Sequence, residues 1–409
     1  MPVPADAADR CEDPRALARS PLFARLCRLY ELPDERQRSA AIEGVRGLAV
    51  ALVFGVHFHA LFSDYLNPAS VSYALSALAW NIGHAGVDVF FALSGALIYE
   101  VVLRRRQTYG GFMRRRVQRI FPCFLAVFAI YVALSFLIPS ESKLPDGALH
   151  AFVYLLANAA LLPGVFPIQP MITVAWSLSY EFLFYALLPP LVYGLAFVPR
   201  TNTDKRELER AARRRVLWLV GITAALSVAF LVWPMSIMRM LMFPAGMLAL
   251  EARNSAWFRS QLTKAGEAAV WALLIVSFPA IVYFSASPAG PIIWTHGALA
   301  VLFVTYFWVV VYVTAFDGSF RRTFSVFGLR WLGNISYSFY LLHGLTLKAL
   351  SVAVHGVLPP GAYGTTIFWT MLLVGFPAAF AASTLLFVTV EKPLSLRKRP
   401  APVARGGVV

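Results

Sequence analysis

The chain alternates between long apolar stretches and short polar loops that are mostly basic. Windows of about 20 predominantly apolar residues, the length a helix needs to cross the hydrocarbon core of a bilayer, recur along nearly all of its 409 residues. This pattern predicts an all-α, polytopic integral membrane protein of about ten transmembrane helices. We place the predicted spans at residues 43–62, 80–103, 117–138, 173–198, 214–233, 235–250, 267–287, 292–315, 331–354 and 364–390.

One apolar segment, His150–Leu162, does not fit this series of full spans. It has about 13 residues, fewer than a crossing needs, and Pro163, Pro167 and Pro170 follow it. A full crossing would also move the next basic cluster to the outer side, against the positive-inside rule. We therefore predict that Pro139–Met171 is an extracytoplasmic excursion whose re-entrant or interfacial segment precedes the fourth span and folds back as a lid.

Composition supports a membrane protein. Hydrophobic residues make up 59% of the chain and charged residues only 14%, whereas soluble domains carry roughly 25%. This small number of charges cannot cover a water-facing surface. Membrane lipid must therefore contact most of the molecule.

The net charge of +15 indicates orientation rather than nucleic-acid binding. Lys and Arg gather in alternate loops, while loops such as Ser63–Ala79 and Ser285–Pro291 almost lack them, which predicts a multi-pass protein of the bacterial inner (plasma) membrane with both termini in the cytoplasm. No basic groove with interleaved aromatic residues lies outside the spans, so we expect no nucleic-acid partner. The basic clusters are Arg104–Arg106, Arg114–Arg116 with Arg119, Arg200–Arg215, Arg253–Lys264, Arg321–Arg330 and Arg397–Arg399.

Three regions follow from these features: a cytoplasmic N-terminal tail at 1–40, a membrane domain at 41–395 and a basic cytoplasmic C-terminal tail at 396–409. The first region has no long apolar core and does not resemble a cleavable signal peptide, but an amphipathic helix is expected around Arg15–Leu32. Three cysteines without regular spacing indicate neither a disulfide framework nor a zinc site, so no metal is predicted.

Arg46 and His57 share the first span, eleven residues apart. That spacing is about three helical turns, so both side chains project from one face, about 16 Å apart along the axis. Ionisable groups inside a membrane are costly and are candidates for function. One interpretation is an anion site at the cytoplasmic end and a base in mid-membrane; the alternative is an interfacial arginine and a histidine bonded to a neighbouring helix.

Two carboxylates also lie inside predicted spans. Asp88 belongs to the second span and Glu181 to the fourth, and each must be protonated, paired across helices or in contact with water. Holding a histidine in place is one physically sensible use. Ser94 and Gly95 form a small step that lets helices approach closely, and Ser94 lacks the surroundings of a nucleophile elbow.

Arg116 and Arg119 are spaced i, i+3 at the start of the third span, so they share a helix face at the cytoplasmic mouth. Two guanidinium groups there could grip phosphates. The alternative is a basic anchor that only sets orientation. Trp176, Tyr337 and His343 are further candidates for lining a cavity, although a histidine such as His343 alone is more often a satisfied structural residue.

Taken together, these segments resemble the acyltransferase-3 family of membrane O-acyltransferases, which includes O-antigen and exopolysaccharide O-acetylases. The resemblance covers about residues 40–395. The strings that carry it, in chain order, are Arg46 with His57, Gly86-Val-Asp-Val-Phe-Phe-Ala-Leu-Ser-Gly95, Arg116-Val-Gln-Arg119-Ile-Phe-Pro122, Trp176-Ser-Leu-Ser-Tyr-Glu181-Phe-Leu-Phe-Tyr185, Ile335-Ser-Tyr-Ser-Phe-Tyr-Leu-Leu-His343 and Val390-Glu-Lys-Pro393.

The resemblance implies transfer of an acyl group, usually acetyl, from the donor substrate acyl-CoA to a hydroxyl of a saccharide or glycolipid, with no bound cofactor. No esterase-like segment follows the last span, so a separate esterase-like partner could complete the transfer. The sequence does not indicate an oligomeric state.

From these residues we expect His57 to act as general base or acyl relay, with Glu181 or Asp88 holding its tautomer. Arg46, Arg116 and Arg119 are expected to bind the phosphates of the donor. The alternative function is a transporter or flippase of a lipid-linked or anionic substrate, although the internal repeats and paired broken helices typical of secondary transporters are not found.

Overall fold

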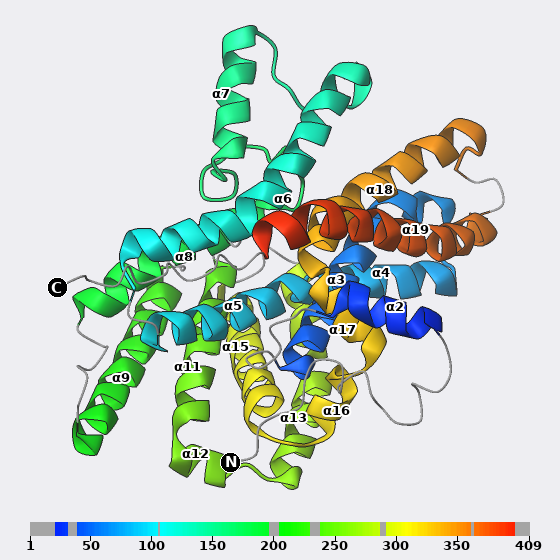
Figure 1. The fold of residues 1–409 in the computed structure, drawn as a ribbon. Coiled ribbons are helices and arrows are strands. Elements are labelled where there is room, and N and C mark those ends of the chain that lie inside the picture. The colour runs from blue at the N-terminus through cyan, green and yellow to red at the C-terminus, as the bar shows by residue number, and fades with distance from the viewer. Residues whose placement is uncertain are drawn as a thin grey trace.

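The computed structural model describes residues 21–31, 39–104, 107–195, 204–229, 238–286, 292–360 and 364–396. Helices form almost all of this part of the chain, and no strand occurs in it (Figure 1). The helices are α2 Pro21–Tyr30, α3 Ala40–Phe62, α4 Val71–Gly83, α5 Ala85–Arg104, α6 Tyr109–Leu137, α7 Ala148–Ala159, α8 Ala175–Gly194, α9 Lys205–Ala229, α11 Met242–Asn254, α12 Ala256–Ser260, α13 Lys264–Val276, α14 Phe278–Ala286, α15 Ile292–Ala315, α16 Ser319–Phe324, α17 Phe327–Asn334, α18 Ser336–Val357 and α19 Gly364–Leu386. A π-helix, η5 Phe387–Ser395, continues α19, and short 3-10 turns lie at Ser63–Tyr65, Pro139–Glu141 and Arg239–Leu241.

The all-helical prediction is confirmed, but the count of about ten spans is not. Within the described residues, six helical stretches are long and apolar enough to cross a membrane. The six stretches are Ala40–Tyr65, Val71–Arg104, Tyr109–Leu137, Lys264–Tyr283, Trp294–Ala315 and Gly364–Ser395.

The other predicted spans correspond to helices that are shorter or more polar than a spanning helix should be. Helix α11 has only 13 residues, and the first half of α9 is rich in charge. Glu181 interrupts the apolar run of α8, and Lys348 with two histidines interrupts that of α18. One boundary was also misplaced, because α4 forms over Val71–Gly83 where the sequence suggested a loop.

The predicted excursion contains helix α7, which extends with the end of α6 beyond the rest of the molecule (Figure 1). Polar side chains tie this excursion together. The Lys143 ammonium group donates to the carbonyls of Pro170 and Met171 and to the Thr173 hydroxyl, each at 3.1 Å. The buried Asn158 amide accepts from the Met171 N–H at 2.7 Å. The position of α7 relative to the bilayer stays a prediction.

Close backbone contacts fix the centre of the molecule. Helix α3 packs against α17 so tightly that a Cβ on Gly47 would lie 2.0 Å from the Leu329 carbonyl oxygen, and one on Gly333 1.8 Å from the Glu43 oxygen. The predicted small step in α5 has the same use, because a Cβ on Gly95 would meet the Phe243 carbonyl oxygen of α11 at 2.1 Å. Small residues at such crossings let helix backbones approach closely.

Helix α2 lies within the predicted amphipathic region and packs against the membrane domain. The ring of Tyr30 stacks on Trp331, with centroids 5.4 Å apart, and its hydroxyl bonds to Thr384 at 3.1 Å. The Arg330 guanidinium donates to the Glu31 carboxylate at 2.9 Å. This part of the N-terminal region therefore packs on α17 and α19; residues 1–20 and 32–38 lie outside the described part.

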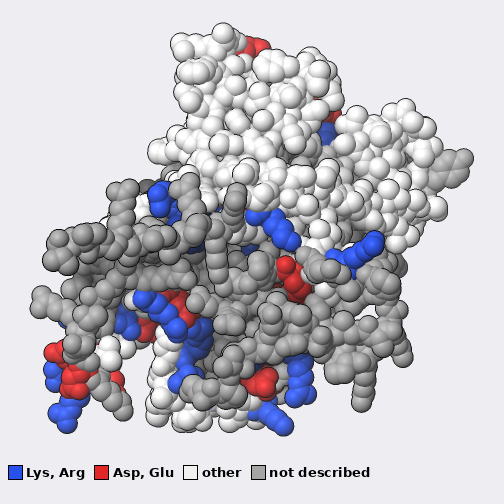
Figure 2. All heavy atoms as spheres, viewed as in Figure 1, with Lys and Arg blue, Asp and Glu red and all other residues white. Residues whose placement is uncertain are grey.

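Charged side chains are unevenly distributed over the surface. In the view of Figure 2, Lys, Arg, Asp and Glu gather on the lower half, over the region of α9, α12 and α16, whereas the upper part around α6 and α7 is almost free of charge. Exposed apolar side chains such as Phe136, Leu149 and Phe152 cover that upper part. This polarity fits the alternation of basic and uncharged loops in the sequence.

Candidate active site

A cavity of about 740 Å³ lies among α3, α5, α6, α8 and α18. Four arginines and three glutamates line it together with apolar and hydroxyl-bearing side chains. Six of the sequence-predicted residues line it: Arg46, Ser94, Arg116, Arg119, Glu181 and Tyr337. Four, namely His57, Asp88, Trp176 and His343, do not.

Two of the arginines present guanidinium groups to the cavity in different ways. Arg46 of α3 donates to the Ser336 hydroxyl of α18 at 3.0 Å. Arg116 of α6 lies over the rings of Phe112 and Tyr185, 5.4 and 5.7 Å from their centroids. The Arg116 Nε is buried without a hydrogen-bond partner among the described residues. Arg116 is therefore held by aromatic faces, and its Nε–H remains able to donate a hydrogen bond to a ligand.

Arg119 has a protein partner that the sequence analysis did not pair with it. Its guanidinium forms a 2.6 Å ion pair with Glu391, a fully buried carboxylate of the π-helix. Glu391 also accepts from the Ser338 hydroxyl at 2.6 Å. Glu391 stood in the Val-Glu-Lys-Pro string without a role, and only the fold brings it to Arg119. Because its charge is already paired, Arg119 is less available to an anion than Arg116.

Glu181 lies along the wall of the cavity in a small network of hydroxyl groups. Its carboxylate accepts from the Ser94 hydroxyl at 2.6 Å and from the Tyr185 hydroxyl. In the part of the chain that the structure describes, no hydrogen bond joins Glu181 to His57. Glu181 is thus positioned to meet a ligand in the cavity rather than to orient that histidine.

Asp88 also has a partner other than His57. Its Oδ2 forms a 2.7 Å ion pair with Arg239, which lies far away in sequence and follows α9. The predicted role of Asp88 in holding His57 is not supported by this contact, since Arg239 satisfies the buried charge. No feature of the sequence near position 239 indicated this pairing.

His57 lies outside the lining of the cavity and next to a second histidine. The rings of His57 on α3 and His343 on α18 have centroids 5.0 Å apart at an angle of 63°. His343 in turn lies 6.1 Å from the ring of Tyr340, and Tyr340 does line the cavity. The Tyr340 hydroxyl is bonded to Ser177 at 2.6 Å. Tyr340 thus borders both the cavity and His343.

Trp176 and Tyr337 occupy opposite sides of the site. Trp176 packs on Tyr180 at 5.8 Å, beside the excursion that contains Gly164. The Tyr337 hydroxyl donates to the Ile120 carbonyl at 2.8 Å, and its ring receives the Arg119 guanidinium at 5.6 Å. Tyr337 thus joins α6 to α18 at the cavity wall, whereas Trp176 supports the loop before α8.

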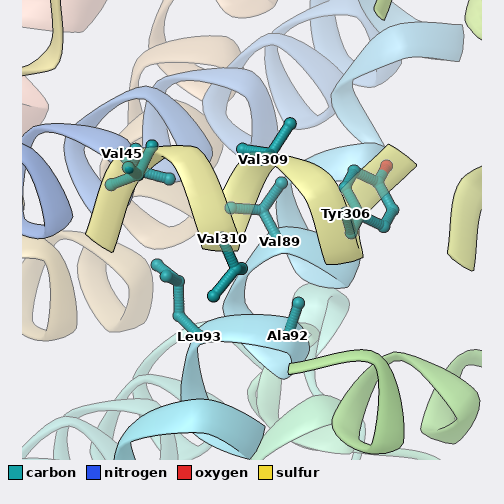
Figure 3. A pocket seen from close by; sticks show the side chains of 8 residues that line it. Val45, Val89, Ala92, Leu93, Tyr306, Val309 and Val310 are labelled. Carbon is teal, nitrogen blue, oxygen red and sulfur yellow. The ribbon is translucent and has the colours of Figure 1, made fainter. Parts of the chain in front are cut away.

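A second gap in the packing is too small and too apolar for a ligand. It measures about 10 Å³ and lies where α3, α5 and α15 meet, between Val45, Leu93 and Val310 (Figure 3). A buried water needs several polar partners, and Tyr306 supplies the only side-chain polar atom in this lining. The gap is a packing defect.

The helices and the arginine-lined cavity define a class, that of polytopic helical membrane proteins with an internal binding site. The family model described as an acyltransferase domain (Acyl_transf_3) matches residues 39–388. The chain belongs to the acyltransferase-3 family, as its motifs indicated, and it is a membrane acyltransferase.

Three relatives extend this result. The chain is 29% identical over 336 residues to the exopolysaccharide production protein ExoZ of Rhizobium meliloti, covering 80% of this chain and 94% of the relative. It is 27% identical over 406 residues to the acyltransferase MdmB of Streptomyces mycarofaciens, covering 91% and 96%. With the peptidoglycan O-acetyltransferase OatA of Listeria monocytogenes it shares 24% over 386 residues, 88% of this chain but 56% of the relative. No solved structure gives a significant match.

Proposed function

We propose that this protein transfers an acyl group, acetyl in the first instance, from acyl-CoA to a hydroxyl of a saccharide or glycolipid at the bacterial inner membrane. The observation that carries the proposal is the cavity, which is lined by four arginines and by Tyr340, whose ring packs near His343, the neighbour of His57. Coenzyme A has matching parts: an anionic head, a slim polar arm and a terminal thioester.

The donor would enter with its thioester first and its anionic head last. Arg46 and Arg116 would hold its phosphates at the predicted cytoplasmic mouth, where the nucleotide stays in water, and Arg119, already paired with Glu391, would contribute less. Arg116 is the strongest candidate because its Nε lacks a partner. Guanidinium groups bind phosphate through paired hydrogen bonds. Glu181 would accept an amide N–H of the pantetheine arm as it passes along the wall.

The chemistry would take place at His57, which the thioester and the acceptor hydroxyl would reach by passing Tyr340. The neutral His57 imidazole removes the proton of the acceptor hydroxyl, and the oxygen attacks the thioester carbonyl. The C–S bond breaks as the new C–O bond forms, and the proton passes from His57 to the leaving sulfur, so that an ester and free coenzyme A result. A histidine suits this exchange because imidazole both accepts and returns a proton near neutral pH.

The acceptor class rests on the relatives. One is an exopolysaccharide production protein and another a peptidoglycan O-acetyltransferase, so a surface saccharide hydroxyl is the first acceptor to test. A separate esterase-like partner remains part of the proposal. Membership of an acyltransferase family does not favour the alternative of a transporter or flippase.

The experiment uses the full chain, purified in lipid nanodiscs, with [14C]acetyl-CoA and surface polysaccharide from a strain that lacks this gene. We expect label to enter the polysaccharide as a base-labile ester. Mass spectrometry of the product would locate the ester. If the wild-type protein neither binds coenzyme A in calorimetry nor transfers the label, acyl-CoA is ruled out as the donor.

A further inference from the structure

His343 combines complete burial with an unsatisfied nitrogen. The side chain has 0% exposure. Its Nδ1 lies 2.9 Å from the backbone oxygen of Phe339. A carbonyl oxygen only accepts, so Nδ1 must carry the proton, and Nε2 is left as a bare lone pair. That Nε2 is buried and has no hydrogen-bond partner among the described residues.

The surroundings of His343 limit what could donate to this lone pair. Phe54, Phe339 and Tyr340 pack around the ring, with centroids 6.4, 5.7 and 6.1 Å away. The Tyr340 hydroxyl is already engaged with Ser177 and with the Val174 carbonyl. The remaining neighbour is the imidazole of His57, whose ring centre is 5.0 Å away.

This spacing suits a hydrogen bond between two imidazoles, since an N···N distance of about 2.9 Å plus the two ring radii gives nearly the same value. The two rings are inclined by 63°, so the His57 ring would have to turn to bring its N–H onto Nε2. Buried polar atoms in native proteins are almost always paired, so this contact accounts for the otherwise orphaned nitrogen.

We propose that His343 is the positioning partner of His57, its Nε2 accepting the His57 N–H so that the other His57 nitrogen faces the acceptor hydroxyl. The inference rests on the proposed acyl transfer. When His57 takes the hydroxyl proton, the N–H bonded to His343 stays in place, and no proton is transferred to His343. A neutral imidazole thus does what a carboxylate does in a triad, the role that the sequence suggested for Glu181 or Asp88.

The test compares two amides at one position. In His343→Asn the amide N–H replaces Nδ1–H and can still donate to Phe339, but nothing replaces Nε2. In His343→Gln the amide oxygen reaches roughly the place of Nε2 and can accept from His57. We expect His343→Asn to lower kcat about a hundredfold with KM for acetyl-CoA unchanged, and His343→Gln to retain about ten times the activity of His343→Asn.

His355→Asn serves as the control, because His355 lies on the same helix but bonds to Asp64 and Ser351, and we expect it to match the wild type. Equal loss in the two amide variants, or wild-type activity in His343→Asn, would overturn the proposal. Thermal unfolding of each variant separates loss of the fold from loss of the contact.

A second measurement does not depend on catalysis. In protein labelled with [15N]histidine, the resonances missing from His343→Asn belong to His343. We expect a protonated Nδ1 and a bare Nε2 whose shift changes in His57→Ala. A protonated Nε2 contradicts the pairing. If the wild type transfers no acyl group, the proposed function fails, and the NMR result still decides whether the two histidines are bonded.

Discussion

The two ends of α3 place candidate functional groups in opposite surroundings. At the Arg46 end, charged side chains line an open cavity of about 740 Å³. At the His57 end, about 16 Å further along the helix, two imidazoles lie among aromatic rings behind Tyr340. The first region suits binding of a hydrated anion, and the second suits proton transfer away from water. In the proposed function, α3 thus carries donor binding at one end and proton transfer at the other.

The largest loss of activity should come from a substitution at the His57 end of α3. His57→Ala removes the proposed base, and we expect acetyl transfer in nanodiscs to fall about 10³-fold, within the range for general acid–base groups. His59→Ala is the matched control: His59 follows on the same helix but bonds to Ser76 of α4 at 2.8 Å. Wild-type turnover in His57→Ala would remove the chemistry from this end.

A substitution in the cavity wall should lower the stability of the protein. Glu391→Ala leaves the Arg119 charge without its partner, and breaking a buried pair costs about 3–5 kcal/mol. We expect a clear fall in the thermal midpoint. The same change at Glu141, whose ion pair with Lys348 is 45% exposed on both sides, should cost less than about 1 kcal/mol. Equal midpoints for the two variants would show that the buried pair does not hold the wall.

Arg116→Ala should weaken binding of the donor without affecting the chemical step. Loss of charge-assisted hydrogen bonds to phosphate is worth about 1.5–3 kcal/mol, so KM for acetyl-CoA should rise about 10- to 100-fold with kcat nearly unchanged. Arg114→Ala, an exposed change on the same helix outside the cavity lining, is the control. A fall in kcat at constant KM would place Arg116 in the chemistry instead.

The smallest effect concerns the excursion. Lys143→Met removes three hydrogen bonds but also a buried charge, so we expect a net loss of about 1 kcal/mol. Burial lowers the pKa of Lys143 below its usual 10.5. The unfolded chain therefore binds more protons at alkaline pH, and this residue makes the free energy of unfolding rise toward pH 10.5. Denaturation at several pH values should show that slope in the wild type and not in Lys143→Met.

Local pattern predicted the elements better than their partners. The apolar windows located α3, α6, α15 and α19 closely, because a spanning helix satisfies its backbone within itself. The predicted windows 173–198 and 331–354 also meet helices, α8 and α18, but Glu181 and Lys348 interrupt their apolar runs, and these two spans are not confirmed.

The site shows the same division. Arg46 and Arg116, which the family resemblance assigned to one donor site, both line the cavity. Spacing along the chain could not pair Arg119 with Glu391 or Asp88 with Arg239, because 272 and 151 residues separate these partners and only helix packing joins them. His343 was undervalued for a similar reason: the free nitrogen and the second imidazole become visible only in three dimensions.

The glycine contacts between α3 and α17 also limit how the protein can move. With the two backbones in direct contact, no change of side-chain rotamer can open a gap between α3 and α17. Widening of the cavity for a bulky substrate is then expected where side chains form its wall, as along α8.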